Sequence, residues 1–376
     1  MSGGLNQYLL DAVAAGASDL HVSFGRPPMV RVNGKIAPLD HPPFTPTTAR
    51  ETVYEVLDAE QRRAFEEHWE LDFAYTPAGV GRFRVNAYFQ KGCVGAAFRV
   101  VPQEVSGFEE LGLPGILEDL ANKPRGLILV TGPTGSGKST TLAAMIDKIN
   151  SERNEHIMSV EDPIEFLHEH KRCLVNQREV NQDTKSMAHA LKHVLRQDPD
   201  VILVGEMRDL ETISLAVTAA ETGHLVLGTL HTRDAPQTVD RIIDVFPAHQ
   251  QSQIRAQLAN VLQGVVTQTL IPRRDGGDRA VACEVLVPTS GIRNLIREGK
   301  SHQIYSSMQT GGKYGMQTLN AALVELVRSE TITFEEAEKR SDDPDELRRL
   351  AGGSRELDYD AAAYGDDSAA VPSRRG

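Results

Sequence analysis

The residues with the clearest chemical meaning form the run GPTGSGKST at positions 132 to 140, which fits the pattern G-x-x-x-x-G-K-[S/T]. Glycines at three of these positions let backbone N–H groups approach phosphate oxygens closely. Lys138 supplies a positive charge for β- and γ-phosphates, and the Ser139 hydroxyl is a ligand for Mg²⁺. The run therefore predicts binding of a nucleoside triphosphate with Mg²⁺ by Gly132, Pro133, Thr134, Gly135, Ser136, Gly137, Lys138, Ser139 and Thr140.

The segments on either side of this loop have the pattern that a phosphate-binding loop requires. Leu127 to Val130 is a short, continuously apolar run typical of a buried strand, and it leads directly into the loop. A helical pattern follows, with Leu142, Met145 and Ile149 on one face. The N-terminus of that helix adds a positive dipole beside the phosphates. A glycine turn that only caps a helix does not explain a lysine and a serine at this spacing.

Glu206 is the first carboxylate after a second apolar run, Val201 to Val204. Ligands bind at the carboxyl ends of strands in open α/β sheets, so Glu206 is a candidate ligand of Mg²⁺ or of water. Gly205 stands where an aspartate is usual, which favours a contact with the metal through water. A solvated glutamate at a strand end is the alternative.

An acidic cluster, Glu161, Asp162 and Glu165, follows a further strand pattern. Pro163 breaks the chain, so Glu165 is expected in a turn, where its carboxylate could take the proton of an attacking water. Read without the rest of the sequence, the cluster is equally typical of a solvated loop.

His224 and His231 flank the apolar run LVLGTL and are seven residues apart. This spacing across a strand excludes a locally paired metal site, but either ring could donate a hydrogen bond to a γ-phosphate. A structural role for each histidine is the alternative.

The order of elements predicts two domains. Residues 1–101 combine helical patterns with short alternating strands, which indicates a small α+β domain, and residues 102–114 carry the glycines and prolines of a linker. Residues 115–340 alternate buried strands with helices, which predicts an α/β fold with a parallel sheet, followed by helices from Pro288 onward. We expect an acidic tail at 341–376, disordered beyond about Gly352.

Composition restricts the possible functions. The net charge of -12 argues against a general nucleic-acid binder. Cys93, Cys173 and Cys283 form no C-x-x-C pair, so we interpret them as reduced thiols rather than as disulfides or zinc ligands. The sequence has no run of 18 apolar residues and no basic signal-like start, so we expect a cytoplasmic protein.

Five segments together resemble the PilT-type retraction ATPases of type IV pili, within the secretion-ATPase superfamily. The resemblance covers residues 1 to 340, and its motifs are GPTGSGKST, VEDPIEF, DPDVILVGEMRD, ETGHLVLGTLHT and GIRNLIRE. The last motif, at 291 to 298, follows the retraction-motor pattern except that Gly291 replaces an alanine. Its helical spacing suits a contact with a partner or a neighbouring subunit, and an ordinary amphipathic helix is the alternative.

The resemblance implies a PAS-like amino-terminal domain joined to a RecA-like ATPase domain, assembled as a ring of six. It makes Glu165 the general base, Glu206 the metal-site glutamate, and His224 with His231 the histidine box. Arginines from a neighbouring domain complete the site in such rings, and the strand RFRV makes Arg82 and Arg84 the candidates. Weaker candidates are Arg99 and Arg208.

The implied function is retraction of a type IV pilus, with a platform protein of the inner membrane as partner and a location at its cytoplasmic face. Related ATPases of pilus assembly and type II secretion usually carry a longer amino-terminal extension and a four-cysteine zinc element, which this sequence lacks. Two other possible classes of function are a non-catalytic nucleotide-binding scaffold and a nucleic-acid translocase. The negative net charge of the protein disfavours the translocase.

Overall fold

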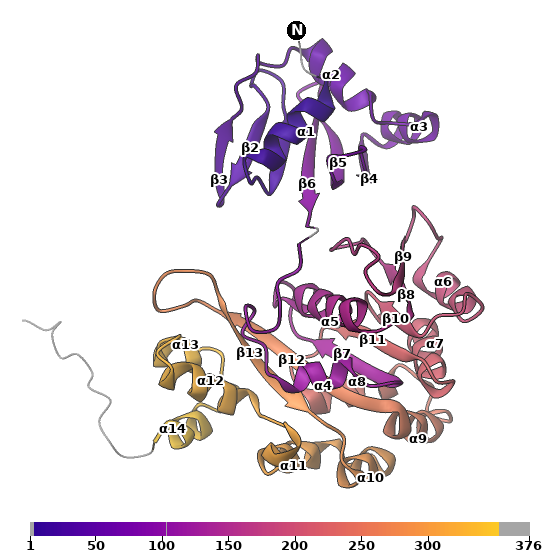
Figure 1. Ribbon diagram of the computed structural model, residues 1–376, viewed down its shortest axis with the longest axis vertical. Coiled ribbons are helices and arrows are strands. Elements are labelled where there is room, and N and C mark those ends of the chain that lie inside the picture. The colour runs from indigo at the N-terminus through magenta and orange to yellow at the C-terminus, as the bar shows by residue number, and fades with distance from the viewer. Residues whose placement is uncertain (1–3, 103, 353–376) are drawn as a thin grey trace, which may run out of the picture.

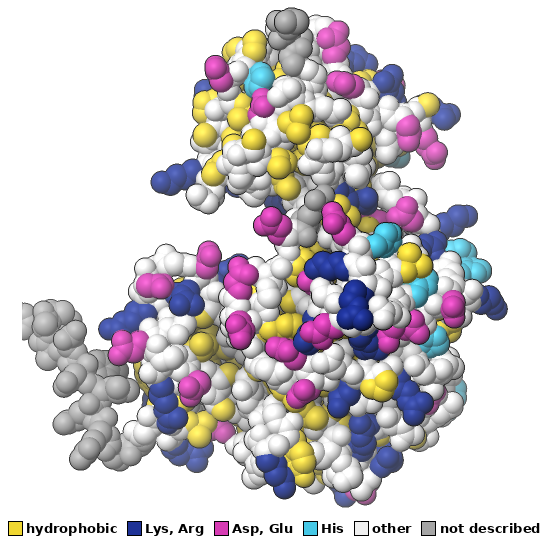
Figure 2. Space-filling model, in the orientation of Figure 1, with side chains coloured by type: hydrophobic (Ala, Val, Ile, Leu, Met, Phe, Trp, Pro, Cys, Tyr) yellow, Lys and Arg dark blue, Asp and Glu magenta, His cyan; other side chains and the backbone are white. Residues whose placement is uncertain are grey.

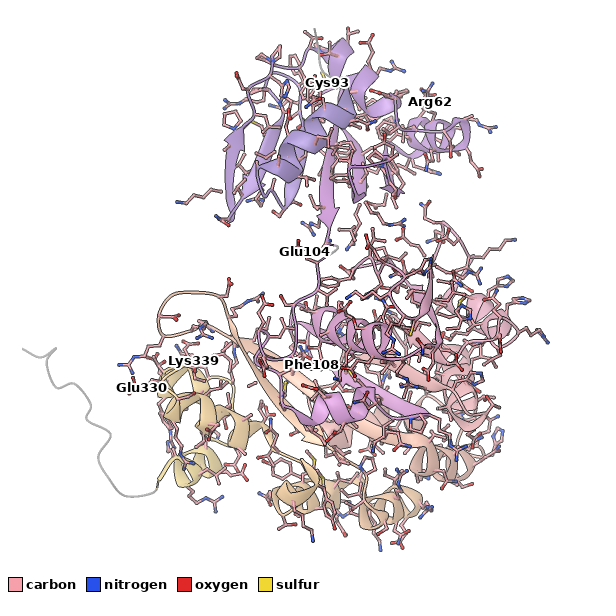
Figure 3. All side chains as sticks on the ribbon, in the orientation of Figure 1. Arg62, Cys93, Glu104, Phe108, Glu330 and Lys339 are labelled. Carbon is pink, nitrogen blue, oxygen red and sulfur yellow. The ribbon has the colours of Figure 1, made fainter. Side chains whose placement is uncertain are left out.

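The computed structural model describes residues 4–102 and 104–352, and these residues form two units with separate hydrophobic cores (Figure 1). The smaller unit contains the amino-terminal residues, and the larger one contains the glycine-rich loop. A single extended segment after strand β6 joins them, and Glu104 and Phe108 mark its course in Figure 3. Within the described residues, no helix has the length and apolar character needed to cross a membrane.

The small unit is built on an antiparallel sheet with the strand order β3-β2-β1-β6-β5-β4. Its strands are β1 (Asp19–Val22), β2 (Met29–Val32), β3 (Lys35–Pro38), β4 (Glu70–Tyr75), β5 (Arg82–Gln90) and β6 (Cys93–Val101), and its helices are α1 (Leu5–Ala14), α2 (Pro46–Tyr54) and α3 (Ala59–His68). Residues alternate between the two faces of β5, so that Phe83 and Val85 are buried in the core. Arg82 and Arg84 therefore lie on the opposite face.

The large unit contains a seven-stranded sheet with the order β13-β12-β7-β11-β10-β8-β9. Its strands are β7 (Gly126–Thr131), β8 (His156–Glu161), β9 (Leu174–Glu179), β10 (Val201–Val204), β11 (Leu225–Leu230), β12 (Leu262–Ile271) and β13 (Ala280–Leu286). Strands β7 to β12 pair in parallel, and β13 pairs antiparallel with β12. Every residue of β7, β10 and β11 is buried, which confirms the predicted parallel sheet covered on both faces.

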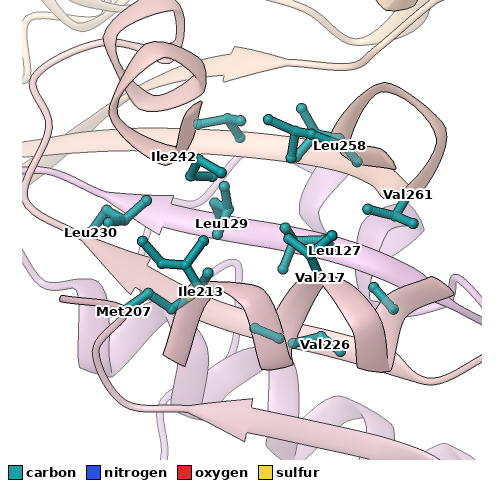
Figure 4. Close-up of a cluster of buried hydrophobic side chains, with 14 of the residues drawn as sticks. Leu127, Leu129, Met207, Ile213, Val217, Val226, Leu230, Ile242, Leu258 and Val261 are labelled. Atoms are coloured by element: carbon teal, nitrogen blue, oxygen red, sulfur yellow. The ribbon is translucent and has the colours of Figure 1, made fainter. Parts of the chain in front are cut away.

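Two hydrophobic clusters cover the two faces of this sheet. Helices α4 (Ile116–Ala121) and α5 (Lys138–Glu152) pack on one face, and α6 (Met187–Val194), α7 (Leu210–Glu221), α8 (Ala235–Asp244) and α9 (Gln251–Val261) pack on the other. Figure 4 shows the second cluster, where Leu127 and Leu129 of β7 meet Ile213 and Val217 of α7. The rigid sheet fixes the strand ends that carry the candidate site.

The motif GIRNLIRE forms most of helix α10 (Ser290–Glu298). Ile292 and Ile296 are buried against the large core, and Leu295 packs partly against it. Arg293 donates hydrogen bonds to the carbonyl oxygens of Ala259 and Asn260, at the end of α9. Arg293 of the motif is thus used in a contact within this chain, between α10 and the end of α9.

Four helices follow α10 in the described chain: α11 (Ile304–Gln309), α12 (Leu319–Arg328), α13 (Phe334–Glu338) and α14 (Pro344–Gly352), with 3₁₀ turns at Ser301–Gln303 and Gly312–Tyr314. Helix α11 packs in the same hydrophobic cluster as α10, and the other three form a further cluster beside β12 and β13. Helix α14 lies in the segment that we expected to be tail, and its Leu347 is fully buried against α12. The predicted domain boundary at residue 340 was therefore wrong. Helix α14 is short and has few apolar residues among many charged ones, so the sequence shows no clear helical periodicity there. The expected disorder beyond Gly352 concerns residues outside the described part.

Candidate nucleotide site

The glycine-rich loop connects β7 to α5, as the sequence predicts. Gly132 has a φ of 132° and Gly137 a φ of 88°, which side chains rarely tolerate. A Cβ at Gly132 would lie 2.3 Å from the carbonyl oxygen of Gln268. Glycine is thus required there both by the backbone conformation and by the close approach of β12.

Lys138, at the first position of α5, is largely buried and folds back over the loop. Its Nζ donates to the carbonyl oxygens of Gly132 (2.8 Å) and Pro133 (3.0 Å) and lies 3.4 Å from Nδ1 of His231. Burial lowers the pKa of Lys138, and the negative charge of Glu206 partly offsets this effect. An entering phosphate would replace the carbonyl partners with a full charge.

Gln268 of β12 is a residue of the site that sequence reasoning missed. Its side-chain amide donates to the carbonyl oxygen of Ser136 over 2.7 Å, at a buried position inside the loop. One residue earlier, the hydroxyls of Thr267 and Thr131 are 2.8 Å apart. Strand β12 therefore holds the loop in place through these side chains. No pattern in the sequence predicts the contacts, because the residues involved are far apart along the chain.

Glu206 lies just beyond the end of β10, as expected. Its Oε1 is 3.1 Å from Nε2 of His231, and its Oε2 accepts a hydrogen bond of 2.6 Å from Arg208. Burial raises the pKa of Glu206, but the hydrogen bond from Arg208 and the charge of His231 outweigh burial and hold the pKa below its usual value. Lys138, His231 and Glu206 thus form a connected row beside the loop, in which Nδ1 of His231 faces the ammonium group and Nε2 faces the carboxylate.

Glu165 lies in the turn after β8 and Pro163, also as expected. Its Oε1 accepts a hydrogen bond of 3.0 Å from Arg84, and its backbone N–H lies 3.4 Å from Oε2 of Glu161. Glu161 is buried and also accepts from Ser159 over 2.7 Å, and burial raises the pKa of its carboxyl. Glu161 belongs to the interior of the turn, whereas Glu165 is half exposed and points to the small unit.

Three arginines of the small unit face this edge of the large unit, and each has a carboxylate partner. Arg82 binds Glu179 (2.9 Å), Arg84 binds Glu165 (3.0 Å), and Arg99 binds Asp19 within its own unit (2.9 Å). Figure 2 shows charged side chains of both signs gathered where the two units meet. Glu179, on β9, was not among the predicted site residues.

A cavity of 710 Å³ joins these groups. It is lined by residues of the loop and of the surrounding strand ends, among them Thr134, Gly135, Gly137, Lys138, Ser139, Thr140, Glu161, Glu165, Glu206, Arg208, His231, Arg84 and Arg99. This volume lies in the range of small-molecule sites. The structure thus brings together Lys138, Ser139, Glu165, Glu206, His231 and Arg84, whereas Arg82 lies beside the cavity on Glu179.

His224 does not belong to this cavity. It precedes β11, next to the start of β7, and its Nδ1 lies 2.9 Å from the carbonyl oxygen of Ala219. His231 follows the same strand at its other end, so about 20 Å of extended chain separates the two rings. The prediction that His224 contacts a γ-phosphate is wrong for this chain, because the two histidines lie at opposite ends of β11 and only His231 is at the end that carries the cavity.

The residues present fit Mg²⁺ held together with phosphates. Among the described residues, no three His, Cys, Asp or Glu side chains form a ready metal cluster. Mg²⁺ commonly takes one or two protein oxygens and completes its shell with phosphates and water. Ser139 and Glu206 line the same cavity and offer a hydroxyl and a carboxylate of this kind.

Comparison with known proteins places the chain in a family. The family model described as Type II/IV secretion system protein matches residues 3–339. The type IV pilus retraction ATPase PilT of Pseudomonas aeruginosa is 51% identical over 341 residues, which are 91% of this chain and 99% of that protein. A twitching motility protein of Neisseria gonorrhoeae is 48% identical over 320 residues, which are 85% of this chain and 86% of that protein.

A solved structure supports the same assignment. The crystal structure of the pilus retraction motor PilT with bound ADP superposes with a TM-score of 0.86 at 50% identity, and the match covers 93% of this chain and 100% of that one. The site geometry, the mixed α/β fold with its parallel sheet and these similarities agree. The chain therefore belongs to the Type II/IV secretion system protein family, and within it to the PilT-type pilus retraction ATPases.

Proposed function

We propose that this chain hydrolyses ATP with Mg²⁺ and that hydrolysis powers retraction of a type IV pilus, and hence twitching motility. The observation that carries the ATPase activity is one cavity that contains Lys138, Ser139, Glu165 and Glu206. The similarity to retraction ATPases over most of the chain supports the coupling to a pilus.

The positions of the main polar residues in the cavity support a role for each of them. The loop amides and Lys138 bind the phosphates, and Glu165 orients water and accepts its proton. His231 lies between Lys138 and Glu206, and it donates a hydrogen bond toward the γ-phosphate once its Nε2 has left Glu206. Ser139 and, through water, Glu206 would hold Mg²⁺, which would supply positive charge beside the β- and γ-phosphates. Arg84 stabilises negative charge on the transferring group once the small unit closes.

The architecture that we propose is a PAS-like domain at 1–101, a linker at 102–114 and a RecA-like domain from 115 onward. The antiparallel sheet of the small unit and the strand-loop-helix order of β7 and α5 support these assignments. Six copies form a ring, in which the site lies between domains and a platform protein of the inner membrane receives the motion. The protein then works at the cytoplasmic face of that membrane, which it reaches only through its partner, and it binds no nucleic acid.

Pilus assembly or type II secretion by the same kind of motor is the alternative. The lack of any C-x-x-C pair in the sequence favours retraction, since the assembly relatives usually carry a four-cysteine zinc element. If the chain were a nucleotide-binding scaffold, it would show no ATP turnover. If it were a nucleic-acid translocase, DNA would stimulate its ATPase activity.

The test compares a chromosomal Lys138→Ala strain with the wild type, together with the purified proteins. We expect the variant protein to lose ATPase activity and the cells to be immotile and hyperpiliated, because fibres are assembled but not withdrawn. Bald cells would assign the chain to assembly instead. Turnover that persists in Lys138→Ala would reject the site itself.

A further inference from the structure

Glu179 occupies a position that connects the two units of the chain. It is the last residue of β9 and only 5% exposed. Its Oε2 accepts a hydrogen bond of 2.9 Å from Arg82 of the small unit and another of 2.9 Å from the backbone N–H of Ile164. Ile164 is the neighbour of Glu165, so one carboxylate oxygen joins the small unit to the turn that carries the proposed base.

Burial makes this contact stronger than the neighbouring ion pair. The side chains of Arg82 and Glu179 are 16% and 6% exposed, whereas those of Arg84 and Glu165 are 38% and 45% exposed. Half-exposed pairs contribute little to stability, but a buried carboxylate that loses its cation is strongly disfavoured. Movement of the small unit is therefore opposed at Arg82 and Glu179 more than at Arg84 and Glu165.

The surroundings of Glu179 leave it few other partners. Its own backbone N–H donates to Asp183 over 2.8 Å, and its carbonyl oxygen accepts from the turn at 182–184, so the backbone is fixed. Arg84 and Arg99 also line the cavity of 430 Å³ beside it, but they are paired with Glu165 and Asp19. If Arg82 withdraws, the carboxylate must turn toward solvent or toward another donor, and its bond to Ile164 changes with it.

We propose that Glu179 is a positioning residue that makes the placement of Glu165 depend on the orientation of the small unit. Arg82 then acts through Glu179 and not on the nucleotide, whereas Arg84 lines the nucleotide cavity itself. This inference rests on the proposed role of Glu165 as the base. It predicts that opening of the small unit loosens the turn at 162–166 and slows turnover without weakening ATP binding.

A double-mutant cycle with Arg82→Ala and Glu179→Ala tests this coupling in the full-length protein. The first readout is hydrogen exchange of the segment 162–166, because Ile164 donates its amide proton to Glu179. We expect Arg82→Ala to speed exchange there at least about threefold when Glu179 is present, and to have no further effect in Glu179→Ala. Exchange in α7 should stay unchanged, which separates local loosening from global destabilisation.

The second readout is ATPase kinetics, with Glu179→Gln as the conservative variant. We expect Arg82→Ala and Glu179→Ala each to lower kcat about tenfold with KM for ATP changed less than about twofold, the double variant to match the singles, and Glu179→Gln to restore part of kcat. The matched control is Arg50→Ala, which breaks an exposed pair with Glu66 inside the small unit.

Effects that add in the double variant, or unchanged exchange at 162–166 in Arg82→Ala, would overturn the proposal. Full turnover in Glu165→Gln would instead reject the assigned base, while the exchange cycle would still report on the contact between Arg82 and Glu179.

Discussion

Arg84 of the small unit and Glu165 of the large unit form an ion pair across the domain boundary, with 3.0 Å between Nη1 and Oε1. The oxygen that accepts a hydrogen bond from Arg84 is already occupied and has less room to accept one from an attacking water. ATP brings negative phosphates that compete for the same arginine. The ion pair therefore belongs to the nucleotide-free state. When ATP binds, Arg84 has to leave Glu165 and contact the phosphates.

Glu165→Gln should abolish turnover and preserve ATP binding. Gln keeps the size of the side chain and its contact with Arg84 but cannot accept a proton, so we expect kcat to fall by about 10²–10⁴-fold. Steady-state ATPase assays and titration with a fluorescent ATP analogue measure the two properties. Glu169→Gln is the matched control, since Glu169 is exposed four residues later, and its kcat should remain near that of the wild type. Equal kcat values for both variants would remove the role of Glu165.

Gln268→Ala should weaken ATP binding through the loop. The substitution leaves the buried carbonyl oxygen of Ser136 without its 2.7 Å donor, at a cost of about 1–3 kcal/mol. We expect KM for ATP to rise about tenfold or more and the melting temperature to fall. Gln263→Ala is the control, because Gln263 lies near the amino end of β12, away from the loop. A KM that is the same in both variants would show that β12 does not hold the loop.

The local patterns predicted the loop, both units and most strands, because each depends on neighbouring residues. Val201 to Val204 is apolar throughout, and such a run has few alternatives to a buried strand. The sequence also predicted a site that contains Lys138, Ser139, Glu165 and Glu206, and these four residues line one cavity because the carboxyl ends of parallel strands meet at one side of the sheet.

Contacts between residues far apart in the chain could not be predicted. Gln268 is 132 residues from Ser136, and Glu179 is 97 residues from Arg82, so no spacing rule connects them. His224 was misplaced for a related reason: its distance from His231 along the sequence is short, but a strand between them carries the rings to opposite edges. His231 follows β11 and His224 precedes it, so only His231 lies at the carboxyl end of the strand, where ligands bind.

Leu347→Ala should destabilise the carboxyl-terminal helices. Leu347 is fully buried in the cluster that joins α14 to α12, and a cavity of this kind costs about 2–5 kcal/mol. Leu350→Ala is the matched control, because Leu350 on the same helix is 41% exposed, and its effect should be small. Thermal unfolding of both variants gives the comparison. Similar melting temperatures for the two would mean that α14 is not part of the folded unit.

Glu284→Gln should stabilise the protein at alkaline pH and not at acidic pH. Glu284 lies on β13 beneath the N-terminus of α8, where its Oε1 accepts a 2.7 Å bond from the backbone N–H of Ala235. Burial raises the pKa of Glu284 to about 7. A carboxyl whose folded pKa is raised stabilises the fold below its unfolded pKa, and this contribution is lost as the pH rises through the folded pKa. The loss therefore falls between about pH 4.5 and pH 7, and it amounts to at most about 3 kcal/mol.

Gln keeps an acceptor for Ala235 and carries no charge, so the variant escapes this loss. Thermal unfolding should show a higher melting temperature than the wild type at pH 8, by a few degrees for a unit of this size, and little difference at pH 4.5. The neighbours Asp234 and Asp342 add negative charge near Glu284, and burial likewise raises the pKa of Asp234. Both aspartates are present in the wild type and in the variant, so the comparison isolates the effect of Glu284. A variant that is less stable than the wild type at pH 8 would mean that the ionised carboxylate has a cationic partner in solution.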